Sequence, residues 1–401
     1  MTRTLNTVGK MLTASSLFLV ASVPSHTVLA ATVPTTVSYE ACVNNFNFPT
    51  LNTGNSSALG LVSMWGFSTT PIATSQAPAN TCGMMAGGST GSPVTVPGKQ
   101  IEIAQGDILN LTLFVNMMTP QEAAATTYQG HTVHLHGADV DSANDGVPET
   151  SLAVTSSYKY VWDMAAQAKA DPKAEPIGSF MYHCHVHTVK HLDMGMYGAI
   201  LVRPKDALGA TIKNQITTSE FSAFNVEQTY VVSAVDPAYH DAVPGGPPVV
   251  GDSPIFADYN PKFFLLNGTE GLTSATPASA AMLSGVAPGS KVALHLVDPV
   301  SVYGLFSIKD AAGTPQSFTL YVEDGRAITP VPTLGDPLTS QTSLEIGPGK
   351  RFDILFTTPM TTPGTTLYPQ IEFKNPRGET ITVKNTAGAI VNAMVYGKVT
   401  F

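Results

Sequence analysis

The sequence predicts an all-β protein made of two β-sandwich domains. Its 401 residues exceed what one ordinary hydrophobic core holds, so two domains of typical size are expected. The 34 glycines and 30 prolines supply frequent turns between short strands rich in Val and Thr. Few segments repeat apolar residues with a helical period, which excludes a mainly helical fold.

The first thirty residues have the composition of a cleavable signal peptide. Arg3 and Lys10 give a basic start, an apolar run extends from Met11 to Val23, and small residues precede Ala31. That run is too short to span a membrane, and no other stretch approaches the roughly twenty apolar residues that a span needs. We therefore expect residues 1–30 to be removed and the protein to be periplasmic or secreted.

The remaining chain divides into two sandwiches and a connection. Residues 31–204 are expected to form the first domain, residues 205–219 a polar linker, and residues 220–401 the second domain. One helix is expected at Met164–Ala170, because Ala and Lys favour helix and an Asp-Pro pair follows them.

The run Met181–Met196 is the most informative stretch, because it holds four histidines, one cysteine and three methionines. One thiolate, two imidazoles and a weak axial thioether form the ligand set of a blue-copper site. Cys184, His191 and Met196 supply three of these ligands. A second motif, residues 128–137, offers further imidazoles at His131, His134 and His136.

Side chains alternate between the two faces of a strand, so spacing sorts these ligands into two groups. Cys184 points to one face of its strand, and the histidines on either side of it point to the other. In the upstream strand His131 lies an odd number of residues from the two later histidines. The first group is therefore His131, Cys184, His191 and Met196, and the second is His134, His136, His183 and His185.

The two motifs together resemble the copper-binding motifs of multicopper oxidases and copper nitrite reductases. Residues 96–107, 145–148, 264–268 and 349–355 also resemble segments of those proteins. The resemblance implies that both domains are cupredoxin-like Greek-key β-sandwiches, and that the second holds no copper motif of its own.

The resemblance also implies the role of each ligand group. The type 1 copper ligands would be His131, Cys184, His191 and Met196. The ligands of a second, catalytic copper site would be His134, His136, His183 and His185. Zinc is the competing metal for this second group, since four imidazoles suit it equally well.

Two departures from the family pattern leave alternatives open. Five residues separate His185 from His191 where the oxidases usually have three, so Met194 competes with Met196 as axial ligand; the Gly-Met pair favours Met196. In the second half only His240 and His295 are available, and neither belongs to a His-x-His pair. The nuclearity of the second copper site is therefore open.

Several residues have plain structural interpretations beside functional ones. His295 lies in an alternating strand, where it is expected to face a polar surface. His187 could join the second group by parity, although it falls where the strand should turn. Asp139, Asp141 and Asp145 follow the first motif and could relay protons, although solvated loop carboxylates are the simpler interpretation.

Cysteine count and charge limit the remaining options. Three cysteines leave one without a partner, and Cys184 is that one; an oxidising compartment permits a disulfide between Cys42 and Cys82, which the sequence leaves open. The net charge of −9 and the 12% content of charged residues exclude the basic face that nucleic acid requires.

The sequence thus predicts an exported copper-dependent oxidoreductase. Electrons from a reduced donor would reach a type 1 copper and then a second copper, where a small oxidant such as dioxygen is reduced. A nitrite-reductase-like enzyme and a non-enzymatic blue-copper electron carrier are the alternatives. The resemblance also implies a homotrimer, because two-domain members of the family commonly place a catalytic metal between subunits.

Overall fold

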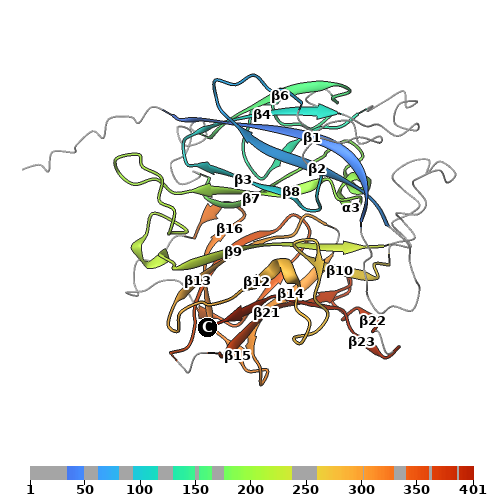
Figure 1. The fold of residues 1–401 in the computed structure, drawn as a ribbon, viewed down its shortest axis with the longest axis vertical. Helices are drawn as coiled ribbons and strands as arrows, with labels where there is room; N and C mark the ends of the chain where they lie inside the picture. Colours follow the sequence, from blue (N-terminus) through green and yellow to red (C-terminus); the bar gives the residue numbers. More distant parts are fainter. Residues whose placement is uncertain are drawn as a thin grey trace, which may run out of the picture. The chain divides into compact units, whose positions relative to one another are not determined.

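The regular secondary structure of the described residues is almost entirely β-strand, as predicted (Figure 1). A computed structural model describes residues 34–48, 62–80, 94–115, 130–149, 153–164, 176–236, 260–300, 302–328, 340–360, 364–385 and 388–401. The predicted signal peptide, all of the predicted helix except Met164, and His240 lie outside these residues. Within them, no helix is long and apolar enough to cross a membrane.

Strands that precede residue 204 form two four-stranded sheets. The first has the order β2-β1-β4-β6, and the second has the order β3-β8-β7-β5. Their bounds are Thr36–Phe48 for β1, Val62–Ile72 for β2, Gly98–Ala104 for β3, Ile108–Val115 for β4, His134–His136 for β5, Ser157–Asp163 for β6, Gly178–His183 for β7 and Tyr197–Arg203 for β8.

Alternation of apolar and polar residues explains how these two sheets pack. In β4, Leu109, Leu111 and Leu113 are fully buried, whereas the intervening residues are half-buried. The leucines join a core that also contains Trp162 and Phe180. Strand β7 differs because all six of its residues are buried, which places it between two layers of structure.

Strands that follow residue 225 form an eight-stranded and a seven-stranded sheet, with a separate pair β22-β23. The larger sheet has the path β11-β10-β9-β13-β20-β16-β17, with β18 beside β16. The other has the path β12-β25-β21-β14-β15, with β19 beside β14 and β24 beside β21. The predicted linker, residues 205–219, lies between β8 and β9, and the exact domain boundaries stay a prediction.

The bounds of these later strands are Val226–Val235 for β9, Phe263–Leu266 for β10, Thr269–Glu270 for β11, Met282–Leu283 for β12, Lys291–Val297 for β13, Tyr303–Asp310 for β14, Pro315–Gln316 for β15, Phe318–Glu323 for β16, Arg326–Ala327 for β17, Ser340–Gln341 for β18, Ser343–Ile346 for β19, Arg351–Thr357 for β20, Thr366–Lys374 for β21, Thr382–Lys384 for β22, Ile390–Asn392 for β23, Met394–Tyr396 for β24 and Lys398–Thr400 for β25. Their apolar faces share one core, which also receives Met181 of β7 and Tyr197 and Ala199 of β8.

A largely buried network of charged groups joins the β3-β8-β7-β5 sheet to the eight-stranded sheet of the second half. The guanidinium of Arg203, in β8, donates to both carboxylate oxygens of Glu227, in β9, at 2.6 and 2.7 Å. It also donates to Glu102, in β3, at 3.0 Å. Because Arg203 is almost fully buried, these carboxylates compensate a charge that would otherwise be costly in this place.

His295, in β13, continues the network and is buried, so the prediction that it faces a polar surface is wrong. Its Nε2 lies 2.9 Å from Glu227 and its Nδ1 lies 2.5 Å from Asp353, in β20. Asp353 also accepts hydrogen bonds from the backbone N–H and the hydroxyl of Ser179, in β7, at 2.8 and 2.5 Å. Burial alone would lower the pKa of His295, but the two carboxylates raise it to about 9.

Replacing His295 with Gln should flatten the fall in stability between about pH 6.5 and pH 9. In the wild-type protein the raised pKa stabilises the fold fully below the unfolded value of 6.5, and this contribution is lost as the pH rises through about 9. Urea unfolding at several pH values measures the slope; an equal slope in both proteins would contradict the prediction. The charged groups nearest the ring are Glu227, Asp353 and, through Glu227, Arg203.

Candidate metal centres

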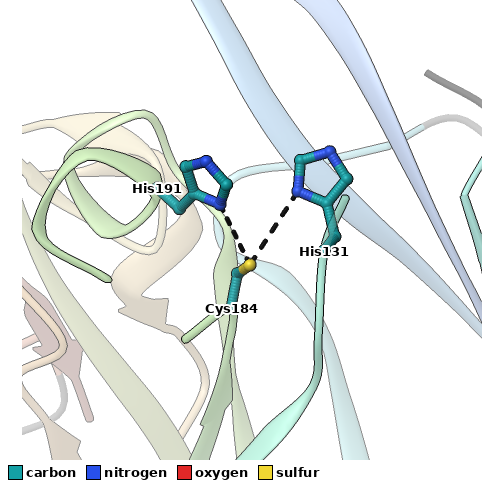
Figure 2. Close-up of side chains that lie close together, drawn as sticks. All are labelled: His131, Cys184 and His191. Atoms are coloured by element: carbon teal, nitrogen blue, oxygen red, sulfur yellow. Dashed lines mark hydrogen bonds between the residues drawn. The ribbon is translucent and has the colours of Figure 1, made fainter. Parts of the chain in front are cut away.

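The first predicted ligand group is brought together inside the first core. Cys184 follows β7, His131 pairs with Val154 in an isolated bridge, and His191 lies in the short helix α3, Thr188–Asp193. Figure 2 shows both imidazoles directed at the thiol, with Nδ1 of His191 at 3.0 Å and Nδ1 of His131 at 3.8 Å from Sγ. All three side chains are fully buried.

Helix α3 was not predicted, and it accounts for the long spacing before His191. Its first hydrogen bond joins the His191 N–H to the carbonyl of His187 at 3.0 Å. His187 has a φ of 43°, so the chain turns sharply there before the helix begins. One helical turn thus takes up the extra residues and returns His191 to the thiol.

Both candidate axial methionines are fully buried in the same core as Cys184. The backbone of Met196 lies against two ligand residues, because its carbonyl accepts from the Cys184 N–H at 3.1 Å and its N–H donates to the His191 carbonyl at 2.9 Å. Met194 instead accepts a hydrogen bond from the Trp65 N–H at 2.8 Å. These are backbone contacts and place neither sulfur, so the choice of Met196 over Met194 as axial ligand stays a prediction.

The geometry of this first group suits a thiophilic metal. Ligand atoms about 2.0–2.3 Å from a shared metal lie roughly 3.5 Å apart, and the two sulfur–nitrogen distances of 3.0 and 3.8 Å bracket that value. The Thr132 N–H points at Sγ from 3.4 Å, which favours the thiolate form that binds metal. Trp65 covers the site, with its ring 5.2 Å from that of His191.

Three of the four histidines in the second predicted group also come together. One ring nitrogen from each of His134, His136 and His183 lies within 4.8 Å of the other two. The pairing of β5 with β7 sets this arrangement, since His134 is directly opposite His183. His185 lies beside them, with its ring centroid 5.1 Å from that of His134, but its nitrogens are outside that set of three.

Hydrogen bonds fix the orientation of these rings. Nδ1 of His134 lies 2.6 Å from the carbonyl oxygen of Asp145 and 3.2 Å from its carboxylate. Nδ1 of His183 lies 2.9 Å from the carbonyl of Cys184, and Nδ1 of His185 lies 3.1 Å from the Thr188 hydroxyl. On the other side of its ring, Nε2 of His183 lies 3.2 Å from Nδ1 of His136. Ring nitrogens directed at one point, with the second nitrogen of the ring held by an oxygen, are typical of metal-binding histidines.

Burial keeps the imidazoles of His134, His136 and His183, the histidine cluster, in the neutral form that binds metal. Desolvation lowers the pKa of His134 and lowers that of His183 well below its usual range. For His136, desolvation and then the positive charge of Arg351 lower the pKa to about 4. A metal would therefore not compete with protons at this site near neutral pH.

The remaining residues singled out in the sequence lie in different surroundings. Asp145 contacts a cluster histidine, a role that its position before the tight-turn residue Gly146 could have suggested. Asp141 instead accepts from Ala143 and Asn144 within its own loop. His187 lies next to the first group, with its ring 6.0 Å from that of His191. Cys184 is not part of a disulfide and Cys42 is disulfide-bonded, while Cys82 is outside the described residues.

Sequence comparison finds a match to a known family in the part of the chain that contains both ligand groups. Residues 69–206 match the family model of multicopper oxidases. A copper-containing nitrite reductase of Alcaligenes xylosoxydans xylosoxydans is 25% identical over 191 residues, which cover 47% of this chain and 52% of that protein. Coagulation factor V of Pseudonaja textilis is 30% identical over 126 residues, but the match spans only 8% of its length.

Solved structures confirm the fold over most of the chain. Fet3p, a multicopper oxidase that functions in iron import, aligns with a TM-score of 0.56 at 15% identity, covering 91% of this chain and 52% of Fet3p. A blue copper oxidase from Nitrosomonas europaea aligns with a TM-score of 0.52 at 17% identity, covering 92% of this chain and 85% of the oxidase. The predicted cupredoxin-like fold and the resemblance to multicopper oxidases and copper nitrite reductases are thus confirmed.

Replacing Gly195 with Ala should disrupt the first ligand group. Gly195 has a φ of 112°, and an added Cβ would lie 2.4 Å from Val96 and 2.6 Å from the Trp65 carbonyl. We expect a loss of about 3–5 kcal/mol in the free energy of unfolding, from backbone strain and overpacking together.

Gly285 provides the matched control for this substitution. It also has a positive φ, of 70°, but nothing lies within 4 Å of an added Cβ. Gly285→Ala should therefore cost only the backbone term, about 1–2 kcal/mol. Equal losses in the two variants, measured by urea unfolding, would show that the contacts around Gly195 contribute nothing.

Proposed function

We propose that the protein is an exported copper-dependent oxidoreductase of the multicopper oxidase type. In this proposal a small oxidant such as dioxygen is reduced with electrons from a separate donor. The observation that carries it is the direct connection between the two ligand groups. Cys184 belongs to the first group, its neighbour His183 belongs to the second, and the ring of His183 is hydrogen-bonded to the carbonyl of Cys184 at 2.9 Å.

Each ligand group has a distinct part in the proposal. Type 1 copper would be held by His131, Cys184, His191 and Met196, and a second copper by His134, His136, His183 and His185. Copper, when bound, would supply reversible one-electron chemistry at both places. The protein contributes the rest. Full burial of the first group excludes water from the thiolate, and the oxygen atoms of Asp145 and Thr188, which lie within hydrogen-bond distance of Nδ1 of His134 and His185, orient those two imidazoles of the second.

The second ligand group favours an enzyme over an electron carrier. A carrier needs only Cys184 and its three partners, whereas this chain also brings ring nitrogens of His134, His136 and His183 within 4.8 Å of one another. Orienting those rings and suppressing their protonation is costly unless a metal binds there. The nitrite-reductase-like alternative differs in the oxidant and in the number of copper ions.

Assembly and location are part of the same proposal. His295 is held between two carboxylates, so it is not available as a ligand for a neighbouring subunit. A homotrimer, which the family resemblance implies, would place the histidine face of one subunit against another. Export to the periplasm or the medium, through the signal peptide expected at residues 1–30, would supply the compartment in which the Cys42 disulfide forms.

The double variant His134→Ala/His136→Ala tests the proposal together with its reciprocal, Cys184→Ser. The wild-type protein should bind at least two copper ions per chain, one of them with the intense blue absorption of a thiolate ligand. The double variant should keep the blue copper and lose the other, and Cys184→Ser should do the reverse. Copper analysis with visible and paramagnetic resonance spectra measures this. A wild-type protein that binds a single copper, with the blue absorption, would contradict the proposed oxidoreductase and favour the non-enzymatic electron carrier.

Replacing Asp145 with Ala should weaken copper binding at the second site. The change removes the carboxylate 3.2 Å from Nδ1 of His134 but leaves the carbonyl of the same residue at 2.6 Å. We therefore expect the low end of the usual effect of such a partner, a loss of about tenfold in metal affinity. Asp141→Ala is the matched control, because that carboxylate is in the same loop and bonds only within it. Competition titration with a copper chelator gives the copper affinity of each variant. Equal affinities in Asp145→Ala and Asp141→Ala would show that the Asp145 carboxylate does not support the second site.

A further inference from the structure

One face of strand β20, in the second sandwich, lies against β5 and β7. These two strands, which carry His134, His136 and His183, are called the histidine strands below. Arg351 and Asp353 are two residues apart in β20, so their side chains project to the same side. Asp353 accepts two hydrogen bonds from Ser179, near the start of β7. Arg351 lies with its guanidinium carbon 5.8 Å from the ring centroid of Phe180, the next residue in β7.

Arg351 and its neighbour Gly349 also lie against the end of β5. A Cβ added to Gly137, which follows His136, would be 2.2 Å from Nη2 of Arg351. A Cβ added to Gly349 would be 3.2 Å from Nε2 of His136 itself. A side chain at either glycine would therefore press on Arg351 or on the ring of His136, and both glycines have a positive φ that other residues rarely adopt.

Strand β5 needs such support because its own pairing is short. It contains three residues, and among the described strands it pairs with β7 alone. Two or three rungs of a ladder hold a strand weakly when no side-chain packing supports it. Yet this strand carries two of the three histidines whose nitrogens come together.

Burial of Arg351 shows how firmly this contact is built. Its side chain is 4% exposed, it donates to the carbonyl of Gly349 at 2.5 Å, and its Nη1 lies 3.6 Å from Asp324. Lys350, the residue between Gly349 and Arg351, is 43% exposed and pairs with Glu323 and Asp324 at 2.9 and 2.7 Å. Adjacent cations thus have opposite environments, and only the buried one contacts the histidine strands.

We propose that Arg351 and Asp353 are positioning residues for the second metal site, through which the second sandwich holds β5 and β7 in register. Residues 349–353 would then support the second metal site from the second domain. That domain provides no described ligand of its own, because His295, its one described histidine, is bound within the charge network. The proposal rests on the function proposed above. It assigns no ligand to these residues: they act through the strands that carry His136 and His183.

Hydrogen exchange of the metal-free, full-length protein tests the positioning directly. Arg351→Met keeps much of the apolar stem and removes the guanidinium, and Lys350→Met removes the neighbouring charge as a control. In Arg351→Met, exchange of the backbone amides of residues 134–136 should become on the order of tenfold faster, while β9 and β21 stay protected. Lys350→Met should leave all three regions as in the wild type. Unchanged exchange in Arg351→Met overturns the proposal.

Copper binding supplies the second readout and separates the two proposals. With copper added alone, Arg351→Met should bind the second copper on the order of tenfold more weakly, with an altered paramagnetic resonance spectrum and an unchanged blue band. A normal second copper in a variant with faster exchange also overturns the positioning role. A wild-type protein that takes up only one copper refutes the proposed function instead, whatever the exchange shows. Should Arg351→Met not fold, Arg351→Lys keeps the charge and is expected to show the same local loss.

Discussion

Alternation of side chains along β7 and the residues that follow it controls the whole arrangement. Phe180, Tyr182 and Cys184 enter the first core, whereas Ser179 and His183 face the other way. The same polypeptide segment can therefore present a thiol to a dry interior and an imidazole to a more open site. Because adjacent residues are involved, the two ligand groups are held at a fixed separation by covalent geometry.

The two ligand groups differ most in their electrostatic surroundings. The first is enclosed by apolar and aromatic side chains, with one backbone N–H directed at the sulfur. The second is bordered by Asp145 on one side and by Arg351 on the other. Apolar surroundings favour the exclusion of small anions and water from the first group, and polar surroundings favour their access to the second.

Composition and turn residues predicted the all-β fold, and strand periodicity predicted how the His and Cys residues sort into two groups. The structure brings together His131, Cys184 and His191, and separately His134, His136 and His183, whereas His185 lies beside the second set. The sequence did not predict α3, since the extra residues before His191 contain no strong helix signal. The sites of Asp145, His295 and Arg351 depend on contacts between distant segments. A sequence pattern of period two shows that His295 belongs to a strand, but not that two carboxylates meet it there.

Shared carboxylates in the buried charge network make the two halves of the chain interdependent. Glu227 serves both Arg203 of the first half and His295 of the second, and Asp353 serves both His295 and Ser179. A fragment that ended after β8 would leave Arg203 with one exposed partner, and the complementary fragment would lose a partner for each acid. The halves are therefore poor modules: neither is suited to separate expression, nor to exchange with the corresponding half of a relative.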